Sequence, residues 1–297
     1  MAAPTSPSLS NLVTEALKKG GYATPSAALV TRASDYWMEE IKNDIWTINK
    51  RCKNLQTTSV AITTENQARY SCPSDYASDL TVTLMHGTTR GTAQTGAAGS
   101  ITLEASEDVT SDFILGKNIL IYDGTAKGNM SQCTAYNSTT KVATIVPDWN
   151  TTPNSTSKYM VVDTYYPLEQ KPIWEYDNIS TPTSRGTPEK FYPIGDPDYG
   201  EFILYPIPHH TSDIPFGIQF RYYANLMKLD LAGTLMATLY QKWREVFTAG
   251  IVWKAYEDMD DSRADTQRTF YRNMLSIFNA SETYGLDLSN LQAKVDA

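Results

Sequence analysis

The spacing of apolar residues changes twice along this 297-residue chain, and that change limits the folds open to it. Near the N-terminus and in the last third, apolar residues recur every three or four positions, the period of an amphipathic helix. Between these regions they recur every second position, as in a strand with one buried face. The pattern predicts an α+β protein in which N-terminal helices and a C-terminal helical hairpin are packed with a β domain.

The N-terminal region predicts two helices. The first covers about residues 9–17 and ends at Gly20–Gly21. In the second, Thr24 is the expected N-cap and Pro25 occupies the first helical position. The face that we expect this second helix to bury consists of Leu29, Val30, Ala33, Tyr36, Trp37, Ile41, Ile45 and Ile48.

Residues 87–164 differ in composition from the rest of the chain. They are rich in Thr, Ser and Gly, and short strand-like pieces such as "KNILIYD" and "KVATIV" alternate with turn sequences such as "DGTAKGN". Short, evenly spaced strands are typical of small sandwiches and barrels. We therefore expect an inserted small all-β (sandwich/barrel-like) module at 87–164, between core segments 1–86 and 165–297.

Two strands follow the insert and are expected to form a hairpin. They are "GEFILYPIP" at 200–208 and "FGIQFRYYANL" at 216–226, with His209–His210 in the connection. The residues that we expect to point inward are Phe202, Leu204, Ile218 and Phe220.

The helical period returns at about residue 233. One helix is expected up to Met259, and a second follows the acidic link "DMDDS". The expected buried stripe of the second helix is Phe270, Tyr271, Met274, Ile277 and Phe278. The tail after Gly285 carries a small apolar hook made of Leu286, Leu288 and Leu291.

Charge and cysteine content exclude several classes of protein. The net charge is −8 and no Lys/Arg cluster stands out, so nothing favours wrapping of nucleic acid. The N-terminus lacks the pattern of a signal peptide, and no apolar run reaches the roughly 18 residues of a membrane span. Cys52, Cys72 and Cys133 are odd in number and widely spaced, which favours a reducing compartment without a disulfide framework.

A search for catalytic motifs finds neither a nucleophile elbow nor a P-loop, HExxH or dinucleotide fingerprint. We therefore expect a protein that is not an enzyme and that has no cofactor and no metal. Adjacent side chains on a strand point to opposite faces, so His209 and His210 suit a turn better than a metal site. A metal-dependent hydrolase that combines these histidines with the acidic residues at 257–265 stays open as an alternative.

Aromatic residues are frequent, with 19 Tyr, 6 Trp and 8 Phe. Tyr and Trp are enriched in interfaces as well as in cores, and they also stack on sugars or single-stranded nucleic acids. Trp149 and Tyr159 in the Thr-rich insert motivate a second alternative. In it, the chain is a tail- or fibre-associated binding module whose β domain contacts a receptor or a fibre.

The order of several segments carries a family resemblance. These segments are "ARYSCPSDY" at 68–76, the insert with its G-x-x-I, G-x-x-x-G and V-A-T pattern, "FILYPIP" followed by "IQFRYYANL", and the helical hairpin. In this order they resemble the head-to-tail adaptor (connector) proteins of tailed bacteriophages, of the short-tailed phage type. One departure is Cys72, where family members often have Leu.

The resemblance implies a structural virion protein of the neck or tail that is assembled in the cytoplasm of the host bacterium. Such adaptors form a homo-oligomeric ring, a dodecamer in the family, below the portal protein. The ring extends the DNA channel without sequence-specific binding, and it attaches the tail nozzle or fibre proteins. We expect no membrane contact.

The same resemblance suggests where contacts lie. For portal docking we expect Leu286, Leu288 and Leu291. The expected ring-interface residues are Trp37, Trp46, Tyr222 and Tyr223, and the expected fibre or nozzle contacts are Trp149 and Tyr159.

Overall fold

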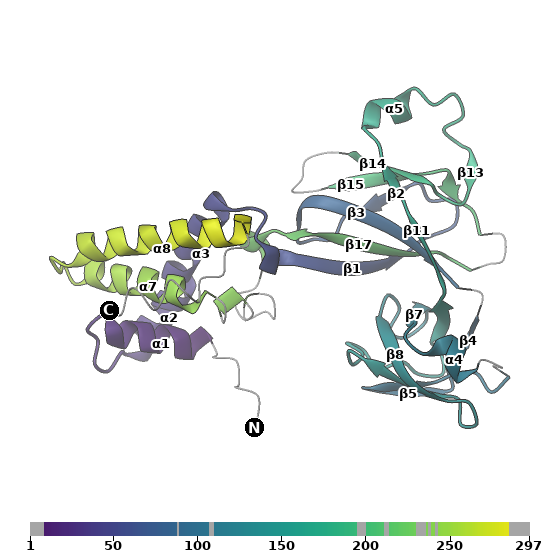
Figure 1. Cartoon of the computed structure of the whole chain (residues 1–297), viewed down its shortest axis with the longest axis horizontal. Coiled ribbons are helices and arrows are strands. Elements are labelled where there is room, and N and C mark those ends of the chain that lie inside the picture. Colours follow the sequence, from purple (N-terminus) through teal and green to yellow (C-terminus); the bar gives the residue numbers. More distant parts are fainter. Residues whose placement is uncertain are drawn as a thin grey trace. The chain divides into compact units, whose positions relative to one another are not determined.

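The computed structural model describes residues 9–87, 89–106, 110–194, 200–210, 214–229, 236, 239–240 and 243–284. The predicted α+β class is confirmed, with helices from both ends of the chain and a multi-sheet β region (Figure 1). The chain forms two compact units. The helical unit comprises Met1–Thr57, Asp75–Ser78 and Tyr223–Ala297, and the β unit comprises Thr58–Ser74 and Asp79–Tyr222. Among the described helices, none has both the length and the apolar composition needed to cross a membrane.

The helical unit is built from segments at both ends of the chain. Its N-terminal elements are α1 (Leu9–Lys19), α2 (Ala27–Arg32), the π-helix η1 (Ala33–Trp37), α3 (Met38–Ile48) and the 3₁₀-helix η2 (Lys53–Leu55). Its C-terminal elements are the 3₁₀-helix η4 (Leu226–Lys228), α7 (Arg244–Asp258) and α8 (Ala264–Tyr284).

The β unit contains three larger sheets and one small one. Sheet A has the spatial order β1 (Gln56–Ile62), β17 (Gly217–Ala224), β3 (Tyr76–His86) and β11 (Thr164–Pro167). Sheet B has the order β12 (Glu169–Gln170), β14 (Lys190–Ile194), β15 (Glu201–Tyr205) and β2 (Arg69–Ser71). Sheet C has the order β4 (Arg90–Thr92), β10 (Lys158–Val162), β7 (Asn118–Asp123), β8 (Met130–Asn137), β9 (Val142–Val146), β6 (Ser100–Thr102) and β5 (Thr95–Ala97). The pair β13 (Arg185–Gly186) and β16 (Ile207–Pro208), with helices α4 (Ser111–Ile114) and α5 (Ile173–Asp177), completes the unit.

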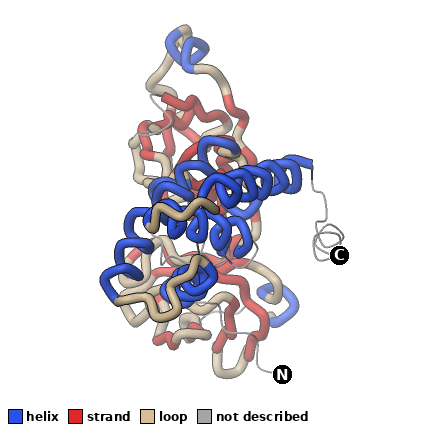
Figure 2. The backbone as a smooth tube through the Cα atoms, turned by 90° about the vertical axis from the view of Figure 1, so that its left-hand side faces the viewer, coloured by secondary structure: helices blue, strands red, loops and turns tan. Residues whose placement is uncertain are grey.

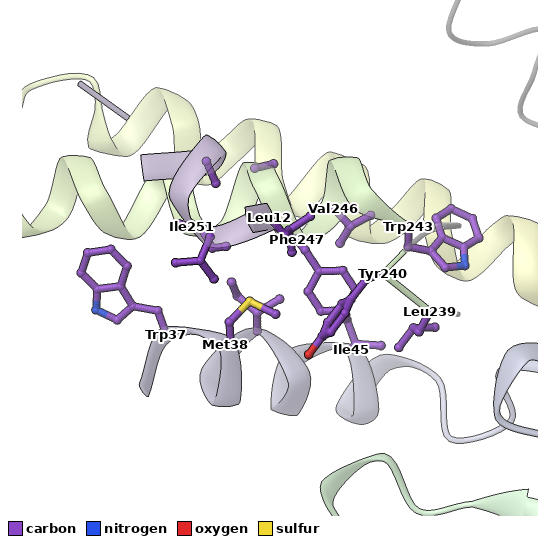
Figure 3. Packing of buried hydrophobic residues seen from close by; sticks show 14 of the residues in the cluster. Leu12, Trp37, Met38, Ile45, Leu239, Tyr240, Trp243, Val246, Phe247 and Ile251 are labelled. Carbon is purple, nitrogen blue, oxygen red and sulfur yellow. The ribbon is translucent and has the colours of Figure 1, made fainter. Parts of the chain in front are cut away.

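One apolar core holds the helical unit together. Figure 3 shows Trp37 and Met38 pointing into the same interior as Phe247 and Ile251 of α7. A glycine brings two of the helices close, because a Cβ at Gly250 of α7 would lie 2.7 Å from the Ile41 side chain of α3. The core therefore joins N-terminal and C-terminal helices that are far apart in sequence.

The second predicted helix begins and winds differently from expectation. The N-cap is Ser26, whose hydroxyl accepts a hydrogen bond from the Leu29 amide, and not Thr24. A π-turn then follows at η1. Of the residues expected inside, Ala33, Trp37, Ile41 and Ile45 are buried, whereas Tyr36 and Ile48 are exposed.

The inserted sheet C closes on itself as a barrel. The edge strands β4 and β5 follow each other in the chain, β4 pairs with β10, and β5 pairs with β6. A single segment, residues 90–97, therefore joins the two ends of the sheet. The barrel interior is lined by apolar residues from the five strands β6 to β10, from α4 and from connecting loops, among them Ile101, Ile114, Ile119, Ile145, Trp149 and Tyr159.

The barrel also packs against sheet A within the β unit. Leu120 of β7 and Met160 of β10 point away from the barrel interior and share a second cluster with Met85 of β3. Burial on both faces explains the unbroken apolar runs of β7 and β10. All seven strands of sheet C lie within the expected insert, 87–164, but this packing makes them part of the same compact unit as sheets A and B.

The expected hairpin at 200–226 is wrong. Strand β15 pairs with β14 and β2 in sheet B, whereas β17 lies between β1 and β3 in sheet A. The two strands face each other across the sheets, with the rings of Phe202 and Phe220 5.6 Å apart between centroids. The inward positions themselves are confirmed, because Phe202, Leu204, Ile218 and Phe220 are all buried.

The buried face of α8 agrees only in part with the expected one. Tyr271, Leu275 and Phe278 are buried, and the ring of Phe278 meets that of Trp243 at 4.4 Å between centroids. Phe270 is instead 43% exposed, because it lies one position before the buried row of residues spaced by three and four.

Candidate interaction surfaces

Four of the predicted contact residues are corrected by the structure. Trp37 and Tyr222, expected at the ring interface, are buried within their own subunit. Trp149 and Tyr159, expected to contact a fibre or nozzle, are buried in the barrel core. A side chain enclosed by its own chain offers no surface to a partner, so these four residues are not contact residues.

The buried rings in the barrel have a structural role. Trp149 donates from Nε1 to the Ser100 carbonyl oxygen at 3.1 Å, and the Tyr159 hydroxyl accepts from the Glu104 amide at 3.1 Å. These bonds satisfy the polar ends of aromatic rings inside an apolar core. The observation that motivated a receptor-contacting β domain is therefore explained by packing.

Of the other predicted contact residues, two are half-buried and three lie outside the described part of the chain. Trp46 and Tyr223 are half-buried, and the Lys50 ammonium lies 5.8 Å from the centroid of the Trp46 ring. They stay predictions for the ring interface. The portal-docking residues Leu286, Leu288 and Leu291 lie outside the described residues.

Both adjacent histidines contact the segment between β1 and β2 in the β unit. His209 Nδ1 lies 3.1 Å from the Glu65 carboxylate, and His210 Nε2 lies 2.9 Å from the Thr63 hydroxyl. Thr63 in turn accepts from the Phe216 amide at 2.8 Å. The pair therefore lies in the connection, as expected, and holds it against the link between β1 and β2.

The acidic run at 257–265 is held by neighbouring cations. Asp258 pairs with Arg32 at 2.8 Å, and Asp261 pairs with Arg263 at 2.6 Å. The hydrogen bonds from Arg263 lower the pKa of the Asp261 carboxyl to about 2. The histidine pair belongs to the β unit and these acids to the helical unit, and the described residues hold no group of three or more His, Cys, Asp or Glu arranged for a metal ion.

A buried carboxylate that the sequence did not reveal ties down the end of α8. Glu282 accepts from the Lys53 amide at 2.9 Å, Asn54 Nδ2 at 3.1 Å, Trp243 Nε1 at 3.1 Å and the Cys52 thiol at 3.2 Å. Burial, together with the nearby negative charge of Glu282, raises the pKa of Cys52 to about 12. Cys52 therefore stays protonated as a hydrogen-bond donor at neutral pH.

An arm without buried residues extends from sheet B. In the α5 arm, which we define as residues 171–187, every side chain is half-buried or exposed. It contains the short helix α5, loops on either side of it and the two-residue strand β13 (Figure 2). Trp174 on this helix is 61% exposed, the most exposed tryptophan in the described part of the chain. A large exposed aromatic ring of this kind marks a candidate contact point.

A second exposed apolar site lies beside the barrel. The α4 patch comprises Phe113, Leu115, Lys117 and Tyr165; Leu115 and Tyr165 are each 43% exposed. The Lys117 ammonium sits 3.3 Å from the centroid of the Phe113 ring, a cation–π contact. Asn118 Nδ2, at the start of β7, donates to the Tyr165 hydroxyl of β11 at 2.7 Å.

Comparison with known proteins adds no assignment to these surfaces. No protein-family model matches the sequence, and no curated protein matches it significantly.

Proposed function

We propose that this chain is a head-to-tail adaptor of a tailed bacteriophage, of the short-tailed type. In this role it is a structural virion protein that forms a ring below the portal, extends the DNA channel and attaches the tail nozzle or fibres. The observation that carries the proposal is the order of the segments that resemble this family.

Each of these segments corresponds to a distinct element of the fold, which supports the proposal. Residues 68–76 include β2 and the start of β3, and the insert forms the closed barrel. "FILYPIP" covers β15 and β16, "IQFRYYANL" covers most of β17, and α7 and α8 form the helical hairpin. The resemblance therefore extends over both units and does not depend on one short motif, but residues 202–208 and 218–226 do not form the hairpin that it implies.

The distribution of charge is compatible with a channel that DNA passes without adhering. The β unit has 17 acidic and 10 basic residues, whereas the helical unit has 16 and 15. Tight binding to phosphates requires clustered Lys and Arg. The β unit is the part of the chain least suited to such binding.

The alternative of a tail- or fibre-associated binding module has one observation in its favour. The outer face of the barrel presents Gln132, Thr134 and Thr144 to solvent on β8 and β9. A glycan array probed with the full chain tests it. Specific binding that Thr134→Val and Thr144→Val abolish would favour this module over the adaptor.

Electron microscopy of the assembly tests the adaptor function. The purified chain is mixed with the portal protein of the same virus and imaged by negative stain, with each protein alone as a control. We expect a second ring stacked on one end of the portal, present only in the mixture. If no stacked complex forms at any ratio of the two proteins, the adaptor function is rejected.

A further inference from the structure

We propose that the α5 arm of one copy docks on the α4 patch of a second copy, so that Trp174 is an anchor between neighbouring subunits. This inference rests on the proposed ring and names one of its subunit contacts.

Contacts with sheet B hold in place the helix that carries Trp174. The Tyr176 ring contacts the rings of Tyr192 and Tyr205, at 5.2 and 6.3 Å between centroids. The Tyr205 hydroxyl also donates to the Thr181 carbonyl oxygen at 3.2 Å. Residues two apart on a helix point in nearly opposite directions, so the same contacts that hold Tyr176 inward turn Trp174 outward. Pre-positioning of this kind lowers the entropy lost on binding.

Two acidic side chains accompany the exposed ring. Glu175 and Asp177 lie on the same short helix, and neither makes an ion pair with another described residue. The nearby Lys171 pairs with Glu169 at 2.6 Å instead. The arm thus offers an aromatic knob with two carboxylates whose charge is not neutralised by an ion pair within the described chain.

The α4 patch has the complementary chemistry. Its apolar surface comes from Leu115, Phe113 and Tyr165, and Lys117 adds a positive charge beside the exposed Asp112 of α4. Lys117 makes no ion pair with a described residue, and its side-chain contact is the face of Phe113. The exposed Trp174 ring with its two neighbouring carboxylates suits an aromatic patch that holds an ammonium group, because apolar area and opposite charges are matched together.

A second copy is the occupant that this complementarity indicates. The knob and the patch are formed by different elements, and each copy carries both. Contacts between two different surfaces of identical subunits are heterologous, and they repeat from subunit to subunit around a ring. A single anchor covers less area than a stable interface, roughly 800 Å² per partner, so the contact is one part of a larger interface.

Zero-length cross-linking tests the contact directly in the full-length protein. Equal amounts of isotope-labelled and unlabelled chains are mixed at high concentration, treated with a carbodiimide, digested and analysed by mass spectrometry. We expect a mixed-isotope peptide that joins Lys117 to Glu175 or Asp177, because the mixed isotopes prove a link between copies. A link found only within one chain, no link at all, or a link from Glu175 only to an added portal or tail protein would overturn the proposal.

Charge reversal provides the second readout. Trp174→Ala, Lys117→Glu and Glu175→Lys should each weaken self-association in sedimentation by about tenfold or more. Combining Lys117→Glu with Glu175→Lys should restore much of the loss, since the pair is re-formed with opposite signs. Tyr36→Ala, an exposed ring in the helical unit, and Lys127→Glu, an exposed cation on the barrel, are the matched controls.

Equal association of all variants would overturn the contact even if rings still stack on the portal. In that case the adaptor function would stand and only this subunit contact would be rejected. A cross-link between copies without portal stacking would support this subunit contact and reject the adaptor function.

Discussion

At the scale of single residues, the buried carboxylate of Glu282 shows how a charge far along the sequence can stabilise a distant loop. Its donors come from residues 52–54 and from Trp243. Sequence patterns reveal apolar periodicity, but they do not reveal which charged side chain is buried with enough donors. The α8 stripe was predicted from large apolar residues, so Glu282 was overlooked although it lies four residues after Phe278.

The Cys52 thiol makes folding stability depend on alkaline pH. Its pKa in the fold is about 12, against 9.0 for an ordinary thiol. Because the folded pKa is raised, this contribution to the free energy of unfolding is complete below pH 9 and is lost between about pH 9 and 12. We expect Cys52→Ser to make the decline in stability with pH shallower in this range, measured by urea denaturation.

Cys72 is the comparison for this prediction. Burial raises its pKa to about 11, so Cys72→Ser should flatten the same decline by a smaller amount. Identical pH profiles for the wild-type protein and Cys52→Ser would contradict the assignment.

At the scale of elements, the sequence predicted which segments are helices and strands better than it predicted their neighbours. Alternation in "EFILY" and "IQFRYYA" correctly placed the inward side chains, but it carries no information about which strands pair. Closure of the barrel was likewise not predictable in detail, since it depends on the pairing of β4 with β10, which lies far along the chain. The π-turn at 33–37 depends on packing and left no trace in the apolar pattern.

Helix α8 offers a matched pair of substitutions. Phe278→Asp places an unpaired charge in the core of the helical unit and should destabilise the protein by at least about 4 kcal/mol. Phe270→Asp, on the exposed side of the same helix, should change stability by about 0.5 kcal/mol or less. Urea denaturation of both variants, with helix content followed by circular dichroism, checks the difference. Equal destabilisation would mean that the buried face of α8 is assigned incorrectly.

Gly87 lies between β3 and β4, where the chain passes close to the backbone of β10. A Cβ at this position would lie 1.9 Å from the backbone oxygen of Val161 in β10, so no side-chain movement can relieve the clash. Gly87→Ala should therefore lower the free energy of unfolding by about 2–3 kcal/mol. Gly186→Ala is the control, because its nearest neighbour would be 3.8 Å away, an ordinary contact. A Gly87→Ala variant as stable as this control would show that the backbone at Gly87 and that of β10 are not this close.

At the scale of the whole molecule, function depends on how the surfaces are distributed over the two units. The β unit carries the closed barrel, the α5 arm and the excess of negative charge, and the helical unit carries the C-terminal segment that follows α8. A closed barrel has no free strand edge, so it does not pair edge to edge with another chain. The exposed aromatic side chains of the arm and patch are then the better candidates for specific contacts.

The C-terminal segment gives the prediction that connects structure to assembly. The Glu282 contacts fix the last turns of α8 in place, so a deletion of residues 286–297 removes none of them. We expect the shortened protein to keep its unfolding midpoint within about 2 °C of the full chain. Its affinity for the portal should fall by about tenfold or more, as happens when apolar anchors are lost. Replacing Leu286, Leu288 and Leu291 by Ser in the full-length chain should reproduce this loss, whereas Lys294→Ala should not. Co-sedimentation with the portal measures the affinities, and an unchanged affinity in the deletion variant would show that portal docking does not use the tail.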